Sequence, residues 1–138
     1  MTVSLTHLAL HVLDLDACIE FYQSYAGMQL IHDRISGGKR IVWLAEKSEG
    51  VSFILVLIPG GPGREQSSKD FSHLGFALET HDAIDTIADR ARTVGILEWE
   101  PREEPYPVGY YCGIKDPDGN FVEFSYGQPL GPGASNEI

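Results

Sequence analysis

The sequence is poor in cysteine and in positive charge, and it has no long hydrophobic run. Its two cysteines, Cys18 and Cys112, form no Cys-x-x-Cys pair and are expected to be reduced thiols of a cytoplasmic protein. Ten Lys and Arg residues stand against twenty Asp and Glu residues, and the net charge of −10 argues against nucleic acids and anionic membranes as partners. No apolar run approaches the ~20 residues of a membrane-spanning helix. The residues after Met1 show no basic region before an apolar core, so we expect no signal peptide.

The apolar residues that are present suffice for one core. The chain has 138 residues, of which 43% are hydrophobic, and this is typical of one compact domain. We place that domain at residues 1–126. Residues 127–138 are rich in Gly, Pro and Ser, and we expect them to form a flexible tail.

The domain carries an internal repeat. Thr6-His7-Leu8-Ala9-Leu10 matches Ser72-His73-Leu74-Gly75-Phe76, and each is followed by an acidic helix start, a helix, a glycine stop and three strands. Module one spans residues 1–58, a linker spans 59–70, and module two spans 71–126. Because a lone β-α-β-β-β module would expose the apolar face of its sheet, the two modules should pair. The predicted fold is α+β, with two tandem βαβββ modules forming a cupped mixed sheet.

The boundaries of the expected elements follow from apolar alternation, helical spacing and turn residues. Helices are predicted at Leu15–Ala26 and Asp82–Val94. A Pro-rich acidic loop is predicted at Arg102–Val108. Strands are predicted at Leu5–Val12, Gln29–Arg34, Lys39–Ala45, Val51–Ile58, Phe71–Leu78, Ile96–Glu100, Gly109–Lys115 and Asn120–Tyr126.

The stretch Ile114–Tyr126 contains the residue with the clearest chemical consequence. Asp116-Pro117-Asp118-Gly119-Asn120 has the residues of a tight turn. In the strand after it, Glu123 lies between large apolar residues, where a carboxylate costs free energy unless its desolvation is compensated. A divalent metal ion would compensate it.

His7, His73 and Glu123 share one property, because each lies in mid-strand on the face opposite the large aliphatic side chains. Two imidazoles and one carboxylate form the facial triad that binds Fe, Mn, Zn or Ni with positions open to substrate. The alternative is that each residue is an ordinary satisfied polar side chain, and this alternative stays open from spacing alone. His7 and His73 occupy the same position in the two repeats and therefore the same face of their strands, which favours the metal site.

Three segments resemble the vicinal oxygen chelate superfamily, which includes glyoxalase I, extradiol dioxygenases, fosfomycin-resistance proteins and bleomycin-resistance proteins. They are His7–Val12 with Asp14-Leu15 and Phe21-Tyr22, then Ser72–Phe76, and then Asp116–Glu123. The resemblance implies His7, His73 and Glu123 as ligands of one divalent metal ion. It also implies a homodimer, and a small organic substrate that chelates the metal through adjacent oxygens.

The branches of that superfamily differ at few positions. Extradiol dioxygenases share the ligand set, so a dioxygenase-like enzyme is our leading prediction, although their tyrosine corresponds to Gly113 here. A glyoxalase-like isomerase or lyase is the alternative, although its extra glutamate corresponds to about Leu55. Fosfomycin-resistance proteins have a threonine at the position of Ala9. A metal-free drug-binding protein, which would lack the ligand set, is the non-enzyme alternative.

Two further residues are candidate catalytic groups. His11 shares the inward face with His7 and could contact substrate or act as a base, and the alternative is a solvated histidine. Tyr110 could donate a hydrogen bond to a bound oxyanion. Because Tyr110 and Tyr111 alternate, only one of them can face the cup, and packing is the alternative role for both.

Overall fold

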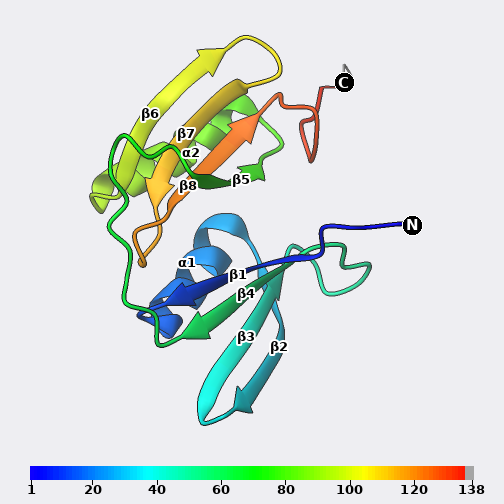
Figure 1. Cartoon of the computed structure of the whole chain (residues 1–138). Helices are drawn as coiled ribbons and strands as arrows, with labels where there is room; N and C mark the ends of the chain where they lie inside the picture. The colour runs from blue at the N-terminus through cyan, green and yellow to red at the C-terminus, as the bar shows by residue number, and fades with distance from the viewer. Residues whose placement is uncertain (136–138) are drawn as a thin grey trace. The chain divides into compact units, whose positions relative to one another are not determined.

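The computed structural model describes residues 1–135 and divides the chain into two units, Met1–Arg64 and Glu65–Ile138 (Figure 1). Each unit is described by itself. The division falls inside the predicted linker, residues 59–70. The predicted tail is described as far as residue 135, and residues 136–138 lie outside the described part.

The first unit has one helix and a mixed sheet with the strand order β1-β4-β3-β2. Strand β1 is parallel to β4, and the other neighbouring strands are antiparallel. The elements of this unit are β1 (His7–Val12), α1 (Leu15–Ala26), β2 (Gln29–Ser36), β3 (Lys39–Ala45) and β4 (Ile54–Pro59).

The second unit repeats this topology with the order β5-β8-β7-β6, in which β5 is parallel to β8. Figure 1 shows one helix beside each sheet. The predicted α+β fold with two tandem βαβββ modules is therefore confirmed. The elements of this unit are β5 (His73–Ala77), α2 (His81–Thr93), β6 (Leu97–Glu104), β7 (Gly109–Lys115) and β8 (Phe121–Tyr126).

Both helices begin and end at the residue types that favour these positions. The side chains of Asp14 and Thr80 accept hydrogen bonds from the backbone N–H groups of Ala17 and Ala83, each at 3.1 Å, and so cap α1 and α2. Gly27 ends α1 with a φ of 63°, a left-handed conformation that glycine adopts without a steric penalty.

Each core lies between a helix and one face of its sheet. Helix α1 packs against β4, and α2 packs against β6, β7 and β8. Alternation along the strands puts the large aliphatic side chains on this face, which leaves the other face of each sheet for polar residues and pockets. The buried core residues include Val12, Cys18, Tyr22, Val42, Leu44, Leu55, Leu57, Ile84, Ala88, Cys112, Ile114, Val122 and Phe124.

The boundaries differ from the sequence prediction mainly at β6. This strand continues to Glu104, so the first half of the loop predicted at Arg102–Val108 is extended backbone. Glu103 pairs with Tyr110 after two register shifts. The irregular register explains the error, because a bulged strand loses the alternation on which the prediction rested. No helix within residues 1–135 is both long and apolar enough to cross a membrane.

Candidate metal centre

Two of the three predicted ligands lie side by side on β5 and β8. The strands are parallel neighbours, with His73 in register with Phe121 and Gly75 in register with Glu123. His73 Nε2 lies 3.8 Å from Glu123 Oε1. A Cβ added to Gly75 would lie 3.6 Å from Glu123 Oε2, so the small residue leaves the carboxylate open toward the pocket.

The orientation of the His73 ring leaves Nε2 available as a ligand. Its Nδ1 lies 2.6 Å from the carbonyl oxygen of Phe71. Because a carbonyl only accepts hydrogen bonds, we infer that Nδ1 carries the proton and that Nε2 of the neutral ring presents a lone pair. Metal-binding histidines in proteins are commonly held by this kind of hydrogen bond.

Glu123 is a carboxylate in an environment that disfavours its charge. The residue is 8% exposed. Burial raises the pKa of its carboxyl group, against the opposing effects of His73 and of the hydrogen bond from Gln128. Gln128 Nε2 donates to Oε2 at 3.3 Å, a long hydrogen bond.

These donors fit a divalent cation. A carboxylate oxygen and an imidazole lone pair that face each other repel unless a proton or a cation lies between them. Metal–ligand bonds to N and O atoms are about 2.1 Å long, so two ligand atoms on one ion can lie up to about 4.2 Å apart. The observed separation of 3.8 Å lies within that limit.

The same face of the second sheet forms a pocket of about 850 Å³. The indole of Trp99 lies against Gly113, where an added Cβ would come within 2.2 Å of Trp99 Cε3. The pocket beside the two candidate ligands combines aromatic and apolar residues with charged and polar ones. Its lining residues are Phe71, His73, Gly75, Trp99, Glu100, Pro101, Arg102, Val108, Tyr111, Glu123 and Gln128.

Tyr111 lines this pocket, whereas Tyr110 faces α2. The Tyr110 hydroxyl donates to Asp85 Oδ1 at 2.5 Å, and its ring stacks on His81 with centroids 3.6 Å apart. The hydrogen bond to Asp85, together with burial, raises the pKa of Tyr110 to about 12. The structure thus turns the predicted catalytic hydroxyl of Tyr110 toward the helix, and Tyr111 has the pocket-facing position.

The first unit contains His7 and His11. His7 lines a second pocket, of about 350 Å³, with Ala9, Arg34, Trp43 and Val56 among its neighbours. Its Nδ1 lies 3.0 Å from Thr6 Oγ1. His11 is exposed and does not line that pocket. Because each unit is described by itself, the convergence of His7 with His73 and Glu123 stays a prediction, as does a catalytic role for His11.

The strand registers correct the sequence comparison at Leu55. Ala9 pairs with Val56 in the first unit, as Gly75 pairs with Glu123 in the second. Val56 is therefore the counterpart of Glu123, whereas Leu55 is only 2% exposed and belongs to the core. The residues of β4 that share the pocket face are Ile54, Val56 and Ile58, and none of them is acidic.

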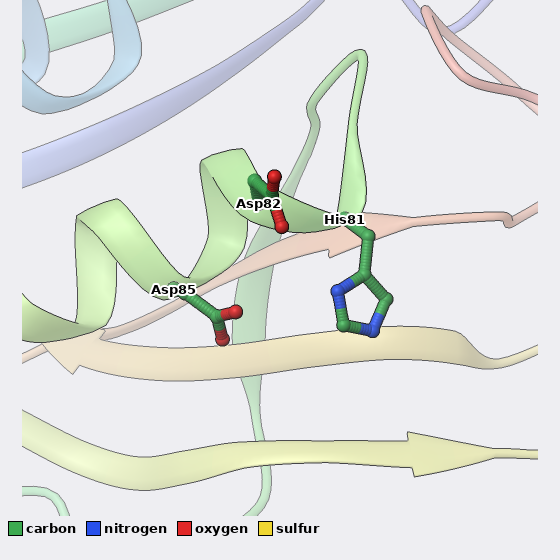
Figure 2. A group of neighbouring side chains, drawn as sticks. All are labelled: His81, Asp82 and Asp85. Carbon is green, nitrogen blue, oxygen red and sulfur yellow. The ribbon is translucent and has the colours of Figure 1, made fainter.

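A different group of possible ligands lies at the start of α2 (Figure 2). His81, Asp82 and Asp85 each offer a ligand atom, and these atoms lie within 4.8 Å of one another. We regard this group as the weaker metal candidate. Asp85 already accepts the Tyr110 hydroxyl, and the partial positive charge of a helix N-terminus disfavours a cation. The i, i+4 spacing of His81 and Asp85 is the sequence signal that would have found it.

Comparison with known proteins gives one relative in sequence and several solved structures with a similar fold. An uncharacterized protein of Pseudomonas aeruginosa is 59% identical over 134 residues, which cover 97% of this chain and 96% of that protein. The fosfomycin resistance protein FosX of Listeria monocytogenes has a TM-score of 0.70 at 17% identity, and the match covers 91% of this chain and 92% of FosX. FosX was solved as a variant with Mn(II) and 1S,2S-dihydroxypropylphosphonic acid. TnmS3, an antibiotic binding protein from Streptomyces sp. CB03234, has a TM-score of 0.65 at 22% identity, covering 91% and 97% of the two chains.

The two structural likenesses show a shared fold, since their sequence identities are low. Membership of a family is shown by a match along the sequence itself. The model of the Glyoxalase/Bleomycin resistance protein/Dioxygenase superfamily matches residues 4–124 of the 138 residues. The chain therefore belongs to this superfamily, the vicinal oxygen chelate superfamily that its motifs resemble.

Proposed function

We propose that this protein is a divalent-metal-dependent enzyme in which His7, His73 and Glu123 hold one Fe, Mn, Zn or Ni ion. Its substrate is a small organic molecule that chelates the ion through two adjacent oxygens. The observation that carries the proposal is the 3.8 Å approach of His73 Nε2 to the buried carboxylate of Glu123. FosX, which shares the fold, was solved with Mn(II).

The chain's own residues have distinct parts in this proposal. When bound, the ion would act as a Lewis acid that stabilises negative charge on a substrate oxygen. The Glu123 carboxylate balances the charge of the ion, and the carbonyl of Phe71 keeps the His73 proton on Nδ1. Trp99 and Phe71 contribute apolar surface to the pocket beside the ligands. Tyr111, in the same wall, is the candidate donor to a substrate oxyanion.

A dioxygenase-like reaction remains the first to test, because the proposed ligand set is the one that the extradiol branch implies. The extradiol branch has a tyrosine at the position of Gly113, which the Trp99 indole covers here. Tyr111 would therefore have to take the role of that tyrosine. A glyoxalase-like isomerase is less well supported, because Val56 lies where a second carboxylate would be needed. Turnover of catechol under oxygen, and of a hemithioacetal, would separate the two reactions.

The non-enzyme alternative is a binding protein that uses the same pocket without a metal. The pocket, with Phe71, Trp99 and Tyr111 in its lining, and the fold shared with TnmS3 favour it. Metal stoichiometry separates it from the enzyme, because a pure binder would hold no ion after exposure to Mn(II), Fe(II) or Zn(II). The homodimer that the resemblance implies belongs to the proposal too, and sedimentation equilibrium of the purified chain tests it.

Elemental analysis of the purified protein is the decisive experiment. We expect about one metal ion per chain, a loss of that ion in His73→Ala, and retention in the matched control His81→Ala. The opposite pattern, with loss only in His81→Ala, would move the metal to the group at the start of α2. Retention in both variants would remove His73 from the ligand set.

A further inference from the structure

Gln66 is buried although it lies in the connecting segment before β5. The residue is 8% exposed. Its side-chain Nε2 donates to the carbonyl oxygens of Asp70 at 2.9 Å and Ser72 at 2.5 Å. Its Oε1 accepts from the backbone N–H of Phe121 at 3.1 Å. Both amide hydrogens and the amide oxygen are therefore used, all by backbone groups.

These backbone partners adjoin the two candidate ligands of the second unit. Ser72 directly precedes His73. Phe121 begins β8, pairs with His73 in the sheet, and lies two residues before Glu123. A single side chain thus connects the entry of one ligand strand to the entry of the other.

The same short segment controls the orientation of the His73 ring. Phe71 lies between Asp70 and Ser72, the two residues whose carbonyls Gln66 holds, and its own carbonyl oxygen receives the His73 Nδ1 hydrogen bond. Displacement of this segment would move the Phe71 carbonyl and free the ring to rotate or to change tautomer. Nε2 would then no longer be fixed beside Glu123.

We propose that Gln66 is a positioning residue for the metal centre, which holds residues 70–72 and Phe121 so that His73 presents Nε2 next to Glu123. The link to metal rests on the function proposed above. The link to the His73 ring does not, since the hydrogen bonds that define it involve protein groups alone. Glutamine suits this position because a glutamate would lose both donors, and a methionine of similar length would lose every hydrogen bond.

The test uses Gln66→Glu and Gln66→Met, with Gln23→Glu on the exposed face of α1 as the matched control. The first readout is the ¹⁵N spectrum of the His73 imidazole in the metal-free protein at about pH 8, where neutral imidazole is the usual form. We expect His73 to be protonated on Nδ1 in the natural sequence and in Gln23→Glu. In both Gln66 variants we expect a mixture of tautomers.

The second readout is Mn(II) affinity, measured by calorimetry. We expect both Gln66 variants to bind about 10- to 100-fold more weakly, the usual effect of losing a group that orients a metal ligand. Gln23→Glu should match the natural sequence. An unchanged tautomer together with an unchanged affinity in Gln66→Glu would overturn the proposal.

Two outcomes keep this test separate from the proposed function. If the natural protein binds no Mn(II), the enzymatic proposal fails while the tautomer measurement still decides the role of Gln66. If neither Gln66 variant folds, the natural protein can still overturn the proposal, because a His73 ring protonated on Nε2 contradicts the hydrogen bond on which the positioning role depends.

Discussion

The two halves of the chain share one topology but differ in what their fourth strands carry. In the first half Ala9 pairs with Val56, and in the second half Gly75 pairs with Glu123. The same strand pair therefore presents an apolar side chain in one half and a buried carboxylate in the other. Because of this difference, residues 65–135 bring two candidate ligands together, His73 and Glu123.

The neighbouring strands differ in a matching way. Trp43 on β3 pairs with Val56 and packs against His32, with ring centroids 4.6 Å apart. At the corresponding place on β7, Gly113 pairs with Glu123, and the indole of Trp99 covers it from β6. The first half thus carries the large side chain of Trp43 on this face, beside the smaller pocket of about 350 Å³, whereas the second half keeps a glycine beside the acid. A duplicated scaffold can change from packing to ligand binding by a few such exchanges.

The strongest test of this comparison is Glu123→Gln, which makes the second half resemble the first. We expect Mn(II) binding to weaken by more than about 100-fold, beyond the usual effect of losing an orienting group. Calorimetric titration measures it. The control is Glu100→Gln, an exposed acid of the same pocket that pairs with Arg92, and it should bind as the natural protein does. Equal binding by both variants would contradict the ligand role of Glu123.

The same variant should make the metal-free protein more stable at neutral pH. Burial raises the pKa of Glu123 above its ordinary value of 4.5. A group with a raised pKa in the folded state adds stability below the ordinary pKa, and that stability is lost as pH rises through the folded value. Glu123→Gln should therefore gain stability relative to the natural protein as pH rises from 4 to 7. Urea denaturation with a chelator present measures the gain.

A second test concerns the glycine beside the acid. In Gly113→Ala the new Cβ would lie 2.2 Å from Trp99 Cε3, and the indole is rigid, so we expect a loss of about 3 kcal/mol of folding stability. Urea denaturation gives the value. Trp99→Ala in the same chain removes the clash, so the double variant should be much less destabilised than the sum of the single variants. Additive losses would show that Gly113 is needed for another reason.

Local patterns explain how much of this arrangement could be predicted from the sequence. Strand alternation and the helix caps Asp14 and Gly27 act over a few residues, and the repeat of His7 at His73 can be recognised in the sequence itself. The fold and the faces of the candidate ligands could therefore be inferred. The sequence comparison is wrong by one residue at Leu55, whose place belongs to Val56, and a shift of one residue reverses the face of a strand. The 55-residue separation between Gln66 and Phe121 leaves no local signal for their hydrogen bond.

The smallest expected effect concerns the side-chain contact between the third strand and the helix of each half. In the first half Arg40 Nη1 pairs with Asp16 of α1 at 3.1 Å, at a solvent-exposed site. In the second half Tyr110 donates to Asp85 of α2 from a partly buried position. Exposed ion pairs contribute about 0–1 kcal/mol, and a hydrogen bond that includes a charged group contributes about 1.5–3 kcal/mol. Tyr110→Phe should therefore cost about 1.5 kcal/mol, more than Asp16→Asn, which breaks the pair with Arg40 and leaves the Arg40–Asp33 pair in place.

The pH dependence of this cost identifies its origin. The hydrogen bond to Asp85 raises the pKa of Tyr110 from 10.0 to about 12, so its stabilising effect is complete below pH 10.0 and is lost as pH rises toward 12. Urea denaturation at pH 8 and at pH 11.5 should show the stability difference between the natural protein and Tyr110→Phe becoming smaller, while the difference for Asp16→Asn stays constant. Because Tyr110 faces α2 and Tyr111 lines the pocket, Tyr110→Phe should also leave Mn(II) affinity unchanged. A weaker Mn(II) affinity in that variant would show that Tyr110 contributes to the site, and would contradict the assignment of Tyr110 and Tyr111 to opposite faces of β7.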